Sequence, residues 1–155
     1  MTEKQEKIYF QDQWPDIATF CWGCGRDNEH GLQIKSYWDG DEAICEWTAR
    51  EYQMVFPGTV SGGILASIIE CHCGNTAIAH LYKEEGRVLG EKPFPTVVSG
   101  ALKVKYLKPV PIKKPITLRA KVESSSGKKI TISCSLHSKN KLCATGELIA
   151  IKIGV

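Results

Sequence analysis

The sequence predicts an α+β domain in which one long central helix is wrapped by an antiparallel sheet of about six strands. Two strand-like segments precede a single long apolar segment, and four strand-like segments follow it closely. The long segment exceeds the length of a strand, and its apolar residues surround it almost completely, which is typical of a helix buried on most sides. A sheet with one apolar face can wrap such a helix.

The bulk composition indicates one globular domain. The chain has 155 residues, of which 43% are hydrophobic and 24% charged, ordinary values for a soluble domain. We expect an N-terminal arm over residues 1–20 and the domain over residues 21–155. The net charge of +3 is small and the lysines are scattered, which argues against a nucleic-acid partner. No segment approaches the roughly 18 apolar residues of a membrane span, and we expect no secretory signal.

The cysteines indicate a reducing compartment, so we expect a cytoplasmic protein. Their number is odd, and most lie in apolar segments, as reduced core thiols do. Cys21 and Cys24 have the spacing of half a zinc site, but a structural zinc needs four ligands, and no second matching pair is present. Cys71, His72 and Cys73 are neighbours on the predicted helix and point about 100° apart, so they cannot grip one ion together. We therefore expect no metal site and no cofactor.

A hairpin is predicted at the start of the domain. Apolar and polar residues alternate over residues 31–38, and a second strand-like segment covers residues 44–47. Asp39 and Gly40 lie between them, and glycine tolerates the positive φ of a tight turn.

The long helix is expected to begin after Ser61. The Ser61 hydroxyl is a suitable N-cap, and the apolar segment extends from Ile64 to about Tyr82. Gly62 then takes the first helical position, where N–H groups have no internal partner and lie at the positive end of the helix dipole. Such groups can bind an oxyanion, and Gly62 and Gly63 leave room for a ligand to approach. The triplet can equally be a helix start and nothing more.

Four strands are predicted after the helix, over residues 101–107, 116–122, 130–136 and 142–153. Short polar turns separate the last three, which favours antiparallel hairpins. One helix covers only part of a six-stranded sheet, so we expect a second copy of the chain to cover the rest.

Glu70 is the candidate catalytic group. It lies eight residues after Gly62, about two helical turns further on, and no cation stands three or four residues away to pair with it. A carboxyl among apolar residues costs free energy unless it is neutralised. It either pairs with a distant cation or faces water, or it acts as a general base or nucleophile beside an oxyanion site. Its predicted helix face carries only small residues, which leaves space beside the carboxyl group: Gly63, Ser67, Gly74 and Ala77.

Several motifs together resemble those of hotdog-fold acyl-CoA thioesterases of the phenylacetic-acid-degradation type. The resemblance covers roughly residues 20 to 153 and includes a C-x-x-C-G segment, a Pro-Gly-x-x-x-Gly-Gly loop leading into the helix, and Val-x-Tyr-x-x-Pro-Val-Pro on the next strand. The matching stretches are Cys21 to Gly25, Gly31-Leu32, Pro57 to Glu70 and Val97 to Pro111.

The resemblance implies roles for particular residues. The Gly62 N–H would bind the thioester carbonyl, flanked by Ser61 and Gly63. Glu70 would activate water or attack the carbonyl itself. Ser99 would be a hydroxyl residue supplied by the partner subunit.

The resemblance also implies the substrate and the assembly. We expect hydrolysis of acyl-CoA to a free acid and coenzyme A, in a homodimer or a dimer of dimers with shared active sites. Lys105 and Lys108 would meet the coenzyme A phosphates, although both can equally belong to a solvated strand face. No cofactor is implied.

Three positions depart from the family pattern. Ser61 stands where the family usually has histidine, and Val55 where many members have asparagine. The helix acid, here Glu70, is more often aspartate than glutamate. Loss of activity is therefore a second expectation, in which the protein binds acyl-CoA or another acyl ligand without turnover. A hydratase-type enzyme would need a histidine with an acid partner at the helix start, which the sequence lacks.

Overall fold

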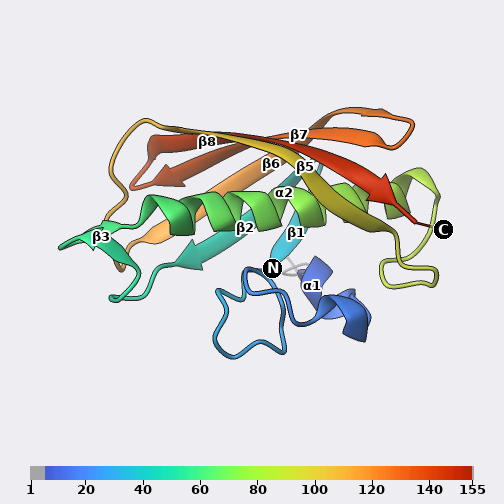
Figure 1. Ribbon diagram of the computed structural model, residues 1–155, viewed down its shortest axis with the longest axis horizontal. Coiled ribbons are helices and arrows are strands. Elements are labelled where there is room, and N and C mark those ends of the chain that lie inside the picture. Colours follow the sequence, from blue (N-terminus) through green and yellow to red (C-terminus); the bar gives the residue numbers. More distant parts are fainter. Residues whose placement is uncertain (1–5, 155) are drawn as a thin grey trace, which may run out of the picture.

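A computed structural model, which describes residues 6–154, contains one long helix wrapped by a six-stranded antiparallel sheet (Figure 1). The predicted fold class is thereby confirmed. A separate small hairpin of β3 (Met54–Phe56) and β4 (Thr59–Val60) precedes the helix α2 (Gly62–Glu84). The main sheet has the order β1 (Ser36–Asp39), β2 (Glu42–Thr48), β6 (Pro115–Ser126), β7 (Lys129–Ser138), β8 (Lys141–Ile153) and β5 (Thr96–Tyr106).

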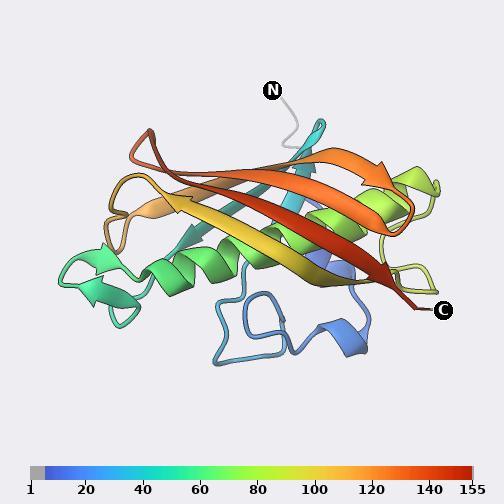
Figure 2. The ribbon, with the colours of Figure 1, turned by 45° about the horizontal axis from the view of Figure 1, so that its top comes forward.

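The core lies between α2 and the concave face of the sheet. Ile68, Ile69 and Ala77 of α2 are fully buried, and Figure 2 shows the strands crossing over the helix along most of its length. Gly146 on β8 permits the closest approach, because a Cβ there would lie 2.4 Å from Ile69 Cγ2. The apolar side chains on most sides of α2 are thus explained by the sheet above it and the N-terminal segment below.

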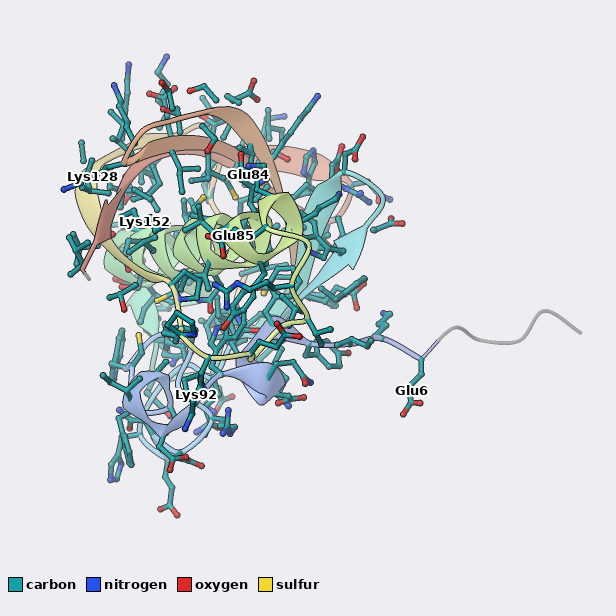
Figure 3. All side chains as sticks on the ribbon, turned by 90° about the vertical axis from the view of Figure 1, so that its right-hand side faces the viewer. Glu6, Glu84, Glu85, Lys92, Lys128 and Lys152 are labelled. Atoms are coloured by element: carbon teal, nitrogen blue, oxygen red, sulfur yellow. The ribbon has the colours of Figure 1, made fainter. Side chains whose placement is uncertain are left out.

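The N-terminal segment covers the face of α2 that the sheet leaves open. Seen along the helix axis, the sheet arches over α2 and the segment lies beneath it (Figure 3). The segment includes α1 (Phe10–Gln13) and the 3-10 turn η1 (Asp16–Ala18). Phe10 and Trp14 are buried in the main core, and the Arg26 guanidinium donates to the carbonyls of Gln11 and Trp14. The described part of the expected arm therefore packs as part of the domain, whereas residues 1–5 of that arm lie outside the described residues.

Three predicted element boundaries are wrong. The strand after the helix begins at Thr96, not at residue 101. The first strand begins at Ser36, not near Gly31, because the N–H groups of Leu32 and Ile34 bond to the carbonyls of Trp22 and Gly23. Gln33 between them has φ of 51°, which interrupts an extended strand. The β6–β7 turn also comes later than the serine-rich run indicated, since β6 continues to Ser126.

Strand β5 lies at the edge of the sheet and contains an irregularity. It pairs only with β8, and the register shifts between Ser99 and Ala101. Because a bulge changes which face the following residues occupy, the side chains of Ser99 and Leu102 both align with helix-facing partners, Ala150 and Leu148.

Among the described helices, none is long and apolar enough to cross a membrane.

Candidate active site

A cavity of about 430 Å³ lies between α2, the start of β5 and the N-terminal segment. Its wall is mainly apolar: Trp14, Ile17, Ile78, Phe94, Val97 and Leu148 contribute to it. The indole of Trp14 stacks on Tyr82 at 5.9 Å and meets the Phe94 ring edge-on at 5.4 Å. This size and lining fit a small organic ligand with an apolar body.

Glu70 and Ser99 are the polar pair in this cavity. The Ser99 hydroxyl donates a short hydrogen bond to Glu70 Oε1, and both side chains line the cavity. Glu70 is partly buried, and none of its described hydrogen-bond partners is a lysine or arginine. The alternative that Glu70 is paired with a distant cation therefore does not hold for the described chain.

Ser99 reaches Glu70 of its own chain, which corrects the expectation that the partner subunit supplies it. The bulge after Ser99 explains the geometry, because it directs Ser99 toward α2 while the rest of β5 keeps its pairing with β8. Gly100 occupies the bulge, where a Cβ would lie 2.9 Å from Ile151 Cγ1. A larger residue would therefore disturb the strand next to Ser99.

The space expected beside Glu70 is present. Gly74 lies one turn further along α2 and lines the same cavity, and a Cβ built there would meet nothing within 4 Å. The helix residues that line the cavity are Glu70, Cys71, Gly74, Asn75 and Ile78. The face is therefore rotated slightly from the predicted one, since neither Ser67 nor Ala77 contributes to it.

Gly62 does not share this cavity with Glu70, contrary to the sequence-based expectation. The two residues are eight positions apart in one continuous helix, and a rise of 1.5 Å per residue separates them by about 12 Å. Both Gly62 and Gly63 are absent from the cavity lining. One thioester carbonyl cannot contact the Gly62 N–H and the Glu70 carboxylate of the same chain.

The helix start has its own arrangement. The Ser61 carbonyl accepts from the N–H groups of Ile64 and Leu65 at 3.1 and 3.2 Å, so α2 begins where it was predicted. The Ser61 hydroxyl forms no capping hydrogen bond, so the prediction of a side-chain cap is wrong. The Tyr106 hydroxyl donates to the Gly62 carbonyl at 2.9 Å.

The two candidate lysines lie away from the cavity. Lys105 lies near the end of β5, on the face opposite Tyr106, and Lys108 comes just after the strand; both are exposed. Neither lines the cavity around Glu70 in the described chain.

His72 is a packed core residue. It is fully buried, with Nδ1 2.8 Å from Ser36 Oγ and Nε2 2.9 Å from the Ala43 carbonyl. Burial lowers the pKa of His72 to about 4, against a smaller opposing effect of the Ala43 carbonyl. The neutral ring therefore donates from Nε2 to Ala43 and accepts the Ser36 hydroxyl at Nδ1.

Three cysteines meet beside Glu70: the structure adds Cys71 to Cys21 and Cys24, although no second matching pair was found in the sequence. The Sγ atoms of Cys21, Cys24 and Cys71 all lie within 4.8 Å of one another. Cys71 Sγ is also 3.6 Å from Glu70 Oε2. Hydrogen bonds from Cys24 and Cys71, and from the backbone N–H groups of Cys24 and Gly23, lower the pKa of Cys21 well below its ordinary value.

Sequence reasoning also missed Asn75, which connects three parts of the site. Its Oδ1 accepts from Trp14 Nε1 at 2.6 Å, and its Nδ2 donates to the Cys71 carbonyl and to Cys24 Sγ at 2.7 and 3.2 Å. The signal was its place one turn after Cys71 in an otherwise apolar helix, where a buried amide needs partners.

Comparisons with known proteins agree with this fold. A family model described as the thioesterase superfamily matches residues 57–144, more than half of the chain. A search of curated proteins found no match.

Solved structures with the same fold include three informative examples. A thioesterase superfamily protein from Shewanella loihica is 28% identical over 83% of this chain and 98% of its own, with a TM-score of 0.66. The PaaI protein from the phenylacetic acid degradation operon of E. coli is 16% identical over 79% and 81%, with a TM-score of 0.65. Thioesterase superfamily member 2 from Mus musculus is 20% identical over 76% and 85%, with a TM-score of 0.60.

The fold and the family match define a hotdog-fold protein of the thioester hydrolase class. The chain belongs to the thioesterase superfamily, and the family resemblance predicted from the motifs is confirmed. The likeness to PaaI extends that resemblance at the level of the fold.

Proposed function

We propose that the protein hydrolyses acyl-CoA thioesters, with Glu70 as general base or nucleophile and Ser99 as the group that positions it. The observation that carries this proposal is the hydrogen bond from Ser99 to Glu70 inside an apolar cavity. The Ser99 hydroxyl occupies Oε1, while Oε2 has only the weak thiol donor of Cys71 at 3.6 Å, so Oε2 retains a lone pair that can take a proton from water or attack a carbonyl. The apolar wall beyond it suits the acyl chain of the substrate.

The oxyanion donor in this proposal is the Gly62 N–H of a neighbouring subunit. The roughly 12 Å between Gly62 and Glu70 along one helix requires that two chains contribute to each site. A homodimer, or a dimer of dimers, with shared sites satisfies this requirement. Ser61 and Gly63 flank the carbonyl position in this arrangement.

The proposal assigns the coenzyme A phosphates to lysines outside the acyl cavity. Lys105 and Lys108 are exposed near the end of β5, toward the Gly62 end of α2, where the Tyr106 hydroxyl contacts the Gly62 carbonyl. Ammonium groups there can bind phosphate as point charges.

The direct test is thiol release from a panel of acyl-CoA substrates by the wild type and by Glu70→Gln. We expect kcat to fall about 10²- to 10⁴-fold in the variant, the range of general base catalysis. Glu84→Gln is the matched control, because Glu84 is on the same helix but outside the cavity. Equal turnover by wild type and Glu70→Gln would remove Glu70 from the mechanism.

A second candidate function is binding of acyl-CoA without turnover. Two observations favour it: the Ser61 hydroxyl, at the position of the usual histidine, forms no capping hydrogen bond, and Val55 is half exposed where many relatives have asparagine. Calorimetric titration with coenzyme A beside the turnover assay separates the two functions, since a binder gives heat without thiol release.

A further inference from the structure

The three cysteines beside Glu70 form a cluster that the hydrolytic mechanism does not use. Cys21 and Cys24 come from the loop of the N-terminal segment, and Cys71 comes from α2. Cys21 and Cys71 are 50 positions apart in the chain, and the fold brings their thiols into contact. Thiols that serve only as core filling do not need to converge in this way.

The sulfur spacing matches metal coordination. Cys21 Sγ and Cys71 Sγ are 3.8 Å apart, and metal–sulfur bonds of about 2.3 Å at a tetrahedral zinc ion place two sulfurs about 3.8 Å apart. A disulfide needs a separation of about 2.05 Å, so the present arrangement is that of three separate sulfur ligands.

The loop between the first two cysteines is built for close approach. The Gly25 N–H donates to the Cys21 carbonyl at 2.7 Å, which closes a tight turn around the pair. A Cβ on Gly23 would lie 2.2 Å from Cys71 Sγ, and one on Gly25 would lie 2.3 Å from the Thr19 carbonyl oxygen. Both glycines are therefore needed to hold the loop against α2.

An outer partner is also present. Asn75 is 5% exposed, and its Nδ2 donates to Cys24 Sγ at 3.2 Å. Hydrogen bonds of this kind orient metal ligands and stabilise their charge.

We propose that Cys21, Cys24 and Cys71 together bind one thiophilic divalent cation of the zinc type, which ties the N-terminal segment to α2. Within residues 6–154, no further cysteine, histidine or carboxylate has a ligand atom within 4.8 Å of all three sulfurs; Glu70 Oε2 approaches that of Cys71 alone, at 3.6 Å. All three cysteines line the cavity, so the fourth position of the ion faces the cavity and is filled from it. Three sulfur ligands select zinc over magnesium or calcium.

The test uses the full chain, reduced and freed of metal with a chelator, and titrated with Co²⁺ as a spectroscopic probe for zinc. We expect the thiolate-to-cobalt charge-transfer band and the visible bands of a tetrahedral site to saturate at one ion per chain, and Zn²⁺ to displace the cobalt. Absence of the charge-transfer band from the folded wild type would overturn the proposal.

Variants identify the ligands. Loss of outer partners weakens metal affinity about 10- to 100-fold, so Cys21→Ser should weaken it more than that, and Cys24→Ser and Cys71→Ser likewise. Cys21 is exposed, so its replacement is the variant least able to disturb folding. Cys143→Ser, at a buried thiol outside the cluster, should bind cobalt like the wild type. Unchanged binding by Cys21→Ser would contradict the assignment.

Glu70→Gln separates this proposal from the proposed function. It should keep the cobalt spectrum while losing thioesterase activity. A Glu70→Gln protein that is inactive but binds cobalt normally supports both proposals, and an active protein with the cobalt spectrum supports the metal site alone.

Discussion

In the proposed mechanism, the hydrogen bond from the Ser99 hydroxyl orients the Glu70 carboxylate. A hydrogen bond to a charged group contributes about 1.5–3 kcal/mol, so Ser99→Ala should lower kcat at least about tenfold. Ser99→Thr keeps the hydroxyl and suits a strand, so it should recover most of the activity. Steady-state kinetics with one acyl-CoA checks both variants.

Ser133→Ala is the matched control for this substitution, because Ser133 bonds to Glu123 on a strand outside the cavity. If Ser99→Ala and Ser133→Ala both retain full kcat, Ser99 has no role in positioning Glu70.

The buried His72 should make folding stability depend on pH. Its pKa is about 4 in the folded chain and about 6.5 when unfolded, so between these values the unfolded chain binds more protons. Stability is fully present above pH 6.5 and declines as the pH falls toward 4, by up to about 3 kcal/mol. Urea unfolding at several pH values measures this slope.

His72→Gln provides the comparison, because glutamine can donate and accept but does not titrate in this range. The variant should lose most of the slope between pH 4 and 6.5. An identical slope in both proteins would show that other groups cause the acid sensitivity.

Gly74 lies inside helix α2 although no neighbouring atom requires a glycine there. Gly74 lies inside the helix with open space at its Cβ position, so Gly74→Ala should raise the free energy of unfolding by about 0.5–1 kcal/mol. Chemical denaturation measures the change.

Gly58→Ala is the contrasting substitution. Its Cβ would also meet nothing within 4 Å, but Gly58 has φ of +83°, a conformation that disfavours alanine. It should destabilise the protein, and a stabilising effect would contradict the conformational argument.

The elements were predictable where local periodicity decides them. The helix from Gly62 followed from the length of its apolar segment, and the space that Gly74 leaves beside its acid followed from the 3.6 residues of a helical turn. The alternation of Leu32 and Ile34 imitated a strand, but Gln33 adopts positive φ and the segment bonds to a loop instead. The bulge after Ser99 does not alter the alternation of apolar and polar residues in the sequence. The contact of Ser99 with Glu70 of the same chain could therefore not be predicted.

Contacts between distant segments were beyond pattern reasoning. Cys71 looked like a small core residue and Asn75 was not singled out, and nothing in the sequence showed that the N-terminal loop packs on them. The helical rise alone could have predicted that Gly62 and Glu70 lie too far apart to share one site, since eight residues span about 12 Å.

If the proposed chemistry is right, the active form of the protein is an assembly of at least two chains. The sheet covers one side of α2 and the N-terminal segment part of the other (Figure 3), while the edge strand β5 exposes Val98, Leu102 and Tyr106. A second copy that covers this edge would also bring its own Gly62 toward Glu70.

Gly62→Pro removes the proposed oxyanion donor with little effect on the helix. Proline is well tolerated at the first helical position, and Ser61 already has φ of −58° and ψ of 134°, as a residue before proline requires. Loss of one such donor should lower kcat about 10²- to 10³-fold, whereas Gly62→Ala keeps the N–H and should keep most activity.

Mixing Gly62→Pro chains with Glu70→Gln chains tests the shared site most directly. After unfolding and refolding of an equal mixture, half of the dimers are mixed, and each holds one site with both groups intact. We predict recovery to about a quarter of wild-type activity from two nearly inactive parents, as the symmetry of a dimer requires. Activity that stays at the level of the parents, with subunit exchange verified by mass spectrometry, would contradict a site built from Glu70 of one chain and Gly62 of another.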